Sequence, residues 1–185
     1  MATRRPVPDA LAEAQDRFIA AWGQMGSTWG ISRTMAEVHA LLYITGEPLC
    51  TDDAMERLEI SRGNASMSLR ALVDWGIVTR VHKRGDRKEY YQAEQDVWSL
   101  LQAVVRQRVK REIHPALASL CEIRDMTGPG AGPGGRPEPE AIASHHARLD
   151  AMIELLRTFD QMGERLSELP TDELRTTAQA LIRET

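Results

Sequence analysis

Apolar residues recur every three or four positions along most of the chain, so the sequence predicts a mainly α-helical protein. Near the middle, a short helix is expected over 51–58 and a second one is capped by the hydroxyl of Ser61. Gly76 stands where a helix commonly ends, and a strand is predicted from Ile77. A polar tip and a return strand then complete a two-stranded hairpin. Helix, turn, helix and hairpin in this order predict a winged helix-turn-helix.

Further amphipathic helices are predicted over about 8–25, 32–45, 96–126, 140–166 and 171–183. We expect Gly26, Ser27 and Gly30 to interrupt the chain after the first of these. Pro115 should bend the third helix or break it after His114. Helices therefore make up most of the chain outside the hairpin.

The two ends have the character of dimerisation elements. The run TGPGAGPGGRPEP over 127–139 is expected to be a flexible loop. The helix after it repeats apolar or small residues every seven positions, at Ile142, Leu149, Leu156 and Gly163. This pattern suits packing against another long helix, in the same chain or in a second copy. We expect three parts: an N-terminal dimerisation helix (1–30), a winged helix-turn-helix DNA-binding domain (31–95) and a C-terminal helical dimerisation region (96–185).

Charge is concentrated in one part of this acidic chain. The formal net charge is -4 over 185 residues. Residues 61–90 hold seven basic and three acidic side chains, so this stretch is +4 and the remainder is -8. An acidic body with one basic module can bind phosphate through that module. The charge pattern thus favours duplex DNA as the partner.

The outward face of the second short helix and the hairpin tip carry the candidate contacts. We expect Arg62 and Arg70 at phosphates or guanine edges, although Arg70 could instead pair with Asp74 one turn later. At the tip, Asp86 is expected to orient an arginine. The predicted DNA-binding residues are Ser61, Arg62, Gly63, Asn64, Ser66, Met67, Arg70, Lys83, Arg84, Arg87 and Lys88. The alternative is a winged helix that contacts proteins, with a basic hairpin that is merely solvated.

Other functional classes receive little support. No apolar run approaches the length of a membrane helix, and the first residues lack the apolar core of a secretory signal. Two unpatterned cysteines, Cys50 and Cys121, are typical of a reducing cytoplasm, with packing or redox sensing as possible roles for Cys50. Metal-ligand spacings, phosphate loops and nucleophile elbows are not recognisable, so we expect no enzyme, cofactor or metal site.

Three strings of the sequence carry a family resemblance. ISRGNASMSLR (60–70), WGIV (75–78) and KRGDRKEYY (83–91) resemble the GbsR branch of the MarR superfamily, over roughly residues 10–125. The resemblance implies a homodimeric winged-helix transcriptional regulator, typically a repressor, with the terminal helices at the dimer interface. A two-fold dimer would present two recognition helices about one DNA turn apart, so we expect a pseudo-palindromic operator. The resemblance also implies a small-molecule effector, with choline or glycine betaine as the class known for some members.

Aromatic residues are scarce, at 5% of the chain, and four of them lie in helices or loops that bracket the helix-turn-helix and its hairpin. Rings around one cleft can hold a quaternary ammonium ion by cation–π attraction. The candidate effector-binding residues are Trp22, Trp29, Tyr43 and Trp98. The plainer interpretation is that these rings fill the core and the helix junctions.

Overall fold

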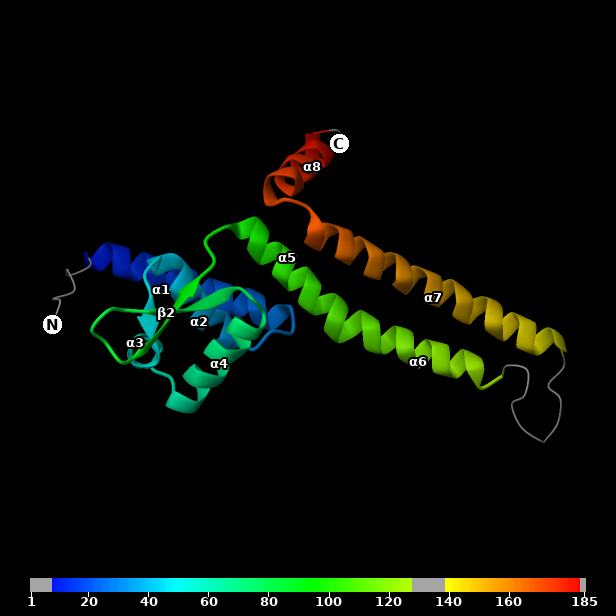
Figure 1. The fold of residues 1–185 in the computed structure, drawn as a ribbon, viewed down its shortest axis with the longest axis horizontal. Coiled ribbons are helices and arrows are strands. Elements are labelled where there is room, and N and C mark those ends of the chain that lie inside the picture. Colours follow the sequence, from blue (N-terminus) through cyan, green and yellow to red (C-terminus); the bar gives the residue numbers. More distant parts are fainter. Residues whose placement is uncertain (1–7, 128–138, 184–185) are drawn as a thin grey trace. The chain divides into compact units, whose positions relative to one another are not determined.

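The computed structural model describes residues 8–127 and 139–183 (Figure 1). The chain divides into two compact units, Met1–Leu100 and Leu101–Thr185. The first unit contains α1 (Asp9–Thr28), α2 (Arg33–Thr45), β1 (Leu49–Cys50), α3 (Thr51–Leu58), α4 (Arg62–Asp74), β2 (Val78–His82) and β3 (Glu89–Ala93). Helix α5 (Val97–Arg108) begins at the end of the first unit, and η1 (Val109–Ile113), α6 (His114–Asp125), α7 (Pro139–Glu168) and α8 (Thr171–Arg183) follow. The fold is mainly helical with a small antiparallel sheet, which confirms the predicted fold class.

The core of the first unit is built around α2. Its largest fully buried side chains are Val38, Leu41, Leu42, Leu69, Leu72 and Val78, from α2, α4 and β2. Each such side chain stabilises the fold by about 1.5–3 kcal/mol relative to exposure. Because α4 buries one face in this core, its opposite face is left toward solvent.

Helix α1 packs against α2 through glycine. The expected interruption at Gly26 and Ser27 is wrong, because α1 continues to Thr28. A Cβ atom on Gly26 would lie 2.6 Å from the Cβ of Ala36, so glycine here permits close helix packing. The chain turns at Gly30, whose φ is +72°, so the expected interruption at this residue is confirmed.

The helix-turn-helix is fixed by local caps. The backbone N–H of Cys50 donates to Asp53 Oδ2 at 2.8 Å at the start of α3. Glu59, with φ of +53°, turns the chain between the two helices. Ser61 Oγ accepts from the N–H of Asn64 at 3.2 Å, as its predicted capping role requires.

The sheet has three strands, in the order β1-β3-β2, instead of the two that were expected. Strands β2 and β3 form the predicted hairpin, with Val78 opposite Ala93 and His82 opposite Glu89. Strand β1 pairs Leu49 with Tyr91 on the other edge of β3. Two residues are too few to show the alternation that reveals a strand in sequence.

The long helix predicted over 96–126 is divided by a π-helical segment, η1. Pro115 follows in the first turn of α6. In a regular α-helix its ring would clash with the carbonyl group of Arg111. Proline also has no N–H to donate, so the regular pattern of α-helical hydrogen bonds cannot continue there. The irregular segment therefore precedes the proline.

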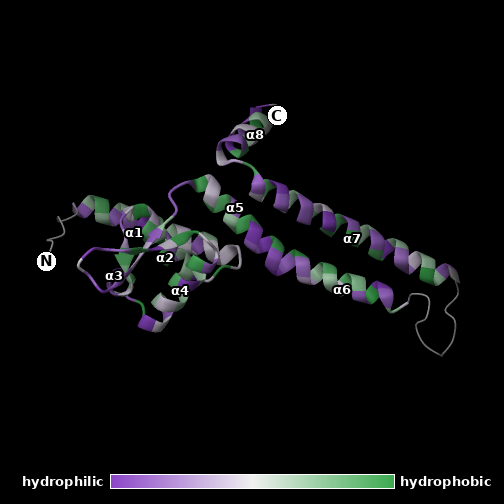
Figure 2. Cartoon of the chain, in the orientation of Figure 1, coloured by the Kyte–Doolittle hydropathy of each residue, from purple (hydrophilic) through white to green (hydrophobic). Residues whose placement is uncertain are grey.

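Helix α7 packs against η1 and α6, with Gly163 beside Val109 of η1, and Ile153 of α7 is buried. His114 Nε2 lies 2.9 Å from Asp160 Oδ1, and Arg124 pairs with Asp150. Figure 2 shows that hydrophilic and hydrophobic residues are mixed along both α6 and α7. None of the helices within the described ranges is long and apolar enough to cross a membrane. The loop expected over 127–139 lies, except for its two end residues, outside the described residues.

Candidate nucleic-acid interface

The exposed face of α4 presents most of the predicted contacts to solvent. Ser61, Arg62, Gly63, Asn64, Met67 and Arg70 are exposed, and Ser66 is half-buried. Ala65 and Leu69 lie on the buried side, at most 1% exposed. The polar residues are thus held outward by the burial of their apolar neighbours.

Arg70 does not make the alternative ion pair with Asp74. Its Nε donates to the backbone oxygen of Ser66 at 3.2 Å, along the surface of α4. The guanidinium group therefore follows the exposed face, and its terminal nitrogens keep donors for a guanine edge or a phosphate.

The wing, residues 83–88 between β2 and β3, is exposed throughout. Gly85, with φ of +86°, makes its turn. Lys83 is held in place, because its Nζ donates to Pro48 O at 3.2 Å and lies 4.0 Å from the centroid of the Tyr90 ring. In the described chain, Arg84 and Arg87 make no ion pair, so their charges are available to a phosphate backbone.

Asp86 does not orient an arginine, contrary to expectation. Its carboxylate accepts from the N–H of Lys88 at 2.9 Å and from the hydroxyl of Tyr90 at 2.8 Å. The Lys88 N–H bond and then the Tyr90 bond lower the pKa of this carboxyl below its ordinary value. Asp86 therefore shapes the wing by binding the backbone and the return strand.

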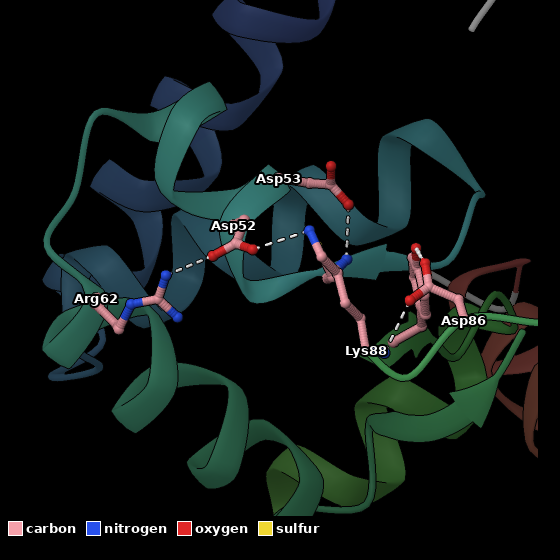
Figure 3. A network of polar contacts seen from close by, with 7 residues as sticks. Asp52, Asp53, Arg62, Asp86 and Lys88 are labelled. Carbon is pink, nitrogen blue, oxygen red and sulfur yellow. Dashed lines mark hydrogen bonds and ion pairs between the residues drawn. The ribbon is translucent and has the colours of Figure 1, made fainter. Parts of the chain in front are cut away.

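Asp52, which was not among the predicted residues, joins the two parts of this surface (Figure 3). Its Oδ1 lies 2.6 Å from Arg62 Nη2 and its Oδ2 lies 3.0 Å from Lys88 Nζ. Two hydrogen bonds lower the pKa of Asp52, the one from Lys88 more than the one from Arg62. The hydrogen bond between Lys88 and Asp52 also raises the pKa of Lys88. Two of the predicted cations thus share one carboxylate.

The predicted effector residues are brought together only in part. Trp22 and Tyr43 both contact Phe18 and His39, with ring centroids 5.7–6.3 Å apart. We call these four residues the aromatic cluster. Trp98 has no ring contact with the cluster in the described chain, and Trp29, which is 53% exposed, caps the end of α1.

His39 is the buried member of the aromatic cluster. It is 3% exposed, and its Nε2 has no hydrogen-bond partner among the described residues. Burial lowers the pKa of this imidazole to about 4. The cluster therefore contains a neutral histidine that sequence reasoning did not single out.

A cavity of about 820 Å³ lies elsewhere, between α6 and α7. Cys121, Arg124, Asp150 and Arg157 are among its lining residues. None of the four aromatic residues predicted for effector binding lines it. The cavity therefore adds nothing to the expected aromatic site.

Comparison with known proteins agrees with this geometry. Residues 29–89 match the MarR family. The chain is 26% identical over 88 residues to the putative HTH-type transcriptional regulator YvaV of Bacillus subtilis (strain 168), covering 48% of this chain and 50% of that protein. It is 26% identical over 90 residues to the HTH-type transcriptional repressor OpcR of the same organism, covering 49% of each chain.

A third relative is matched over a longer stretch. The HTH-type transcriptional repressor GbsR of Bacillus subtilis (strain 168) is 24% identical over 115 residues, which cover 62% of this chain and 63% of that one. The matches span about half the length of the first two relatives. A crystal structure described as that of a transcriptional regulator aligns with a TM-score of 0.57 and 20% identity, over 90% of this chain and 99% of that one. This last likeness supports the fold.

Proposed function

The winged helix-turn-helix of this chain is of the MarR superfamily, and from that premise we propose that the protein regulates transcription by binding duplex DNA. The observation that carries the proposal is the placement of charge. Arg62 and Arg70 lie on the exposed face of α4, and Arg84 and Arg87 on the wing, of a chain that is acidic overall. A helix in the major groove and a wing on the adjacent backbone would use these cations together.

We propose that the protein acts as a homodimeric repressor on a pseudo-palindromic operator. Two of its relatives are named as repressors. A two-fold dimer would present two α4 helices about one DNA turn apart. Apolar residues exposed along α7 offer a surface for the second copy: Met152, Leu155, Phe159 and Met162 are 49–59% exposed.

We propose that a small molecule alters DNA binding, with a quaternary ammonium compound as the candidate class. Trp22 and Tyr43 of the aromatic cluster supply rings of the kind that attract such cations. Titration with choline and glycine betaine, followed by tryptophan fluorescence and by release of DNA, tests this part. An unchanged spectrum and unchanged DNA binding at millimolar ligand would contradict it.

The DNA-binding proposal is tested by selection from a random-sequence duplex pool, followed by measurement of affinity against salt. We expect an enriched site and a steep decline of log affinity with log salt. Replacing Arg84 and Arg87 by alanine should weaken binding to all duplexes and flatten the slope by about 0.9 per lost phosphate contact.

The matched control replaces Arg111 and Arg148, exposed arginines of the second unit, by alanine. This control removes the same charge from a different surface, so its salt slope should equal that of the parent protein. A module that only contacts proteins would show no enriched site and no salt-dependent DNA affinity.

A further inference from the structure

We propose that Asp52 increases the specificity of DNA binding. Its carboxylate forms ion pairs with both Arg62 and Lys88. These ion pairs compete with the phosphates of DNA of arbitrary sequence for the two cations. This inference rests on the proposed DNA-binding function. It assigns to an acidic residue of the DNA-binding surface a role that opposes non-specific binding.

The carboxylate of Asp52, in α3, contacts one cation of α4 and one cation of the wing (Figure 3). Asp52 is in the first turn of α3, Arg62 begins α4, and Lys88 ends the wing. Each cation binds a different carboxylate oxygen, Arg62 at 2.6 Å and Lys88 at 3.0 Å. The single side chain therefore connects the start of the recognition helix with the wing.

The neighbouring acids are engaged differently. Asp53 accepts the N–H of Cys50, and Asp86 accepts the N–H of Lys88 and the Tyr90 hydroxyl. Neither forms an ion pair with a cation of α4 or the wing within the described residues. Of these three acids, Asp52 is thus the one that forms ion pairs with the predicted DNA contacts among the described residues.

All three partners remain accessible to a ligand. The side chains of Asp52, Arg62 and Lys88 are 46%, 68% and 54% exposed. A phosphate approaching Arg62 or Lys88 must therefore compete with the Asp52 carboxylate and also meets its negative charge.

This competition acts unequally on different DNA. A duplex of arbitrary sequence offers mainly phosphates, so its binding depends on the number of available cations. The correct site also offers base contacts to α4, which compensate for exchange of the carboxylate. Asp52 should consequently weaken non-specific binding more than specific binding.

The test compares Asp52→Asn with Asp53→Asn, a neighbour that loses the same charge. Each full-length protein is titrated with a scrambled duplex and with the duplex enriched by selection, at several salt concentrations. For Asp52→Asn we expect roughly tenfold tighter binding of the scrambled duplex near 0.1 M salt, because one or two cations are released for phosphate. The salt slope should steepen by about 0.9 for each cation, and the preference for the enriched duplex should fall.

Further variants isolate the cause. Adding Arg62→Ala and Lys88→Ala to Asp52→Asn should remove the gain on the scrambled duplex. Asp52→Ser, which keeps a residue suited to the start of a helix, should reproduce Asp52→Asn. Thermal melting of each variant verifies that the proteins compared are folded.

The outcomes distinguish this inference from the function on which it rests. Equal changes in Asp52→Asn and Asp53→Asn, or weaker binding of both duplexes by Asp52→Asn, would overturn the specificity role while DNA binding stands. If neither the parent protein nor any variant bound duplex DNA, the proposed function would fail and the inference with it.

Discussion

Arg70 is the residue at which the proposed readout of bases is most directly tested. It lies on the exposed face of α4, and in the described contacts only its Nε is engaged, by Ser66 O. We expect Arg70→Ala to weaken binding to the enriched duplex by about 1–3 kcal/mol. Fluorescence anisotropy measures the affinity, and an unchanged melting temperature would show that the fold is retained. Affinity equal to that of the parent protein would contradict the assignment.

His39 makes stability depend on pH. Its pKa is about 4 in the folded protein, against 6.5 for an ordinary histidine, because burial disfavours the imidazolium. Between these values the unfolded chain binds more protons than the folded one, so the free energy of unfolding falls as pH falls from about 6.5 toward 4. The full loss is on the order of 3 kcal/mol.

Urea unfolding at a series of pH values measures this effect. Carboxylates also titrate toward the lower end, so the contribution of His39 is the difference from His39→Gln. In that variant the free energy of unfolding should decline less steeply with falling pH than in the parent protein. A decline in His39→Gln as steep as in the parent would show that His39 titrates normally.

Single residues also show where sequence reasoning stops. The polar face of α4 could be predicted, since burial of Ala65 and Leu69 on one side dictates it. The role of Asp52 could not, because its partners are 10 and 36 positions away and meet it only through the tertiary fold. Local sequence marks Asp52 merely as an acid suited to the first turn of a helix.

At the scale of elements, prediction succeeded where a local signal marked both ends. The helices expected over 51–58 and 171–183 have those same bounds in the structure. Prediction failed where an element depends on a contact between residues that are far apart in the sequence. Gly26 was interpreted as a break, but its use is the close approach of Ala36. The short strand β1 exists because β3 lies beside it.

Gly163 is a further case of close approach, between α7 and the π-helical segment η1. A Cβ at this position would lie 2.5 Å from Val109 Cγ2. Valine has little rotamer freedom in a helix, so the overlap cannot be relieved by a small rotation. We expect Gly163→Ala to lower the free energy of unfolding by roughly 1–2 kcal/mol, despite the better helix propensity of alanine.

A double-mutant cycle with Val109→Ala tests this cause. Removing the valine methyl groups makes room for the new Cβ, so the pair should be more stable than the sum of the single effects predicts. Simple additivity of the two substitutions, measured by denaturant unfolding, would show that Gly163 serves another purpose.

At the scale of the whole molecule, the proposed dimer is tested through the apolar stripe of α7. Phe159 is 49% exposed and Met162 is 59% exposed, one turn apart. Replacing both with glutamate should convert a two-chain particle to a single chain, because charges buried in an apolar interface lose hydration without gaining partners. Light scattering coupled to gel filtration gives the mass directly.

Thr158→Glu with Gln161→Glu is the matched control, since it adds the same charges to exposed positions on the same turns of α7, outside the stripe. The control should keep the mass of the parent protein. Loss of the dimer in both variants would indicate that added negative charge on α7 repels the two chains wherever it is placed. Retention of the dimer in both variants would show that the interface does not include the apolar stripe. A parent protein with the mass of one chain would refute the dimer itself.

The position of β3 in the sheet bears on how such a protein diversifies. Since β3 is central, paired with β1 on one side and β2 on the other, the base of the wing is held from both edges. Insertions or replacements among residues 83–88 can then alter the reach and charge of the tip while the strand register stays fixed. After gene duplication, copies could thus acquire a different overall affinity for DNA by drift in a six-residue segment, with the hydrophobic core left under its original constraint.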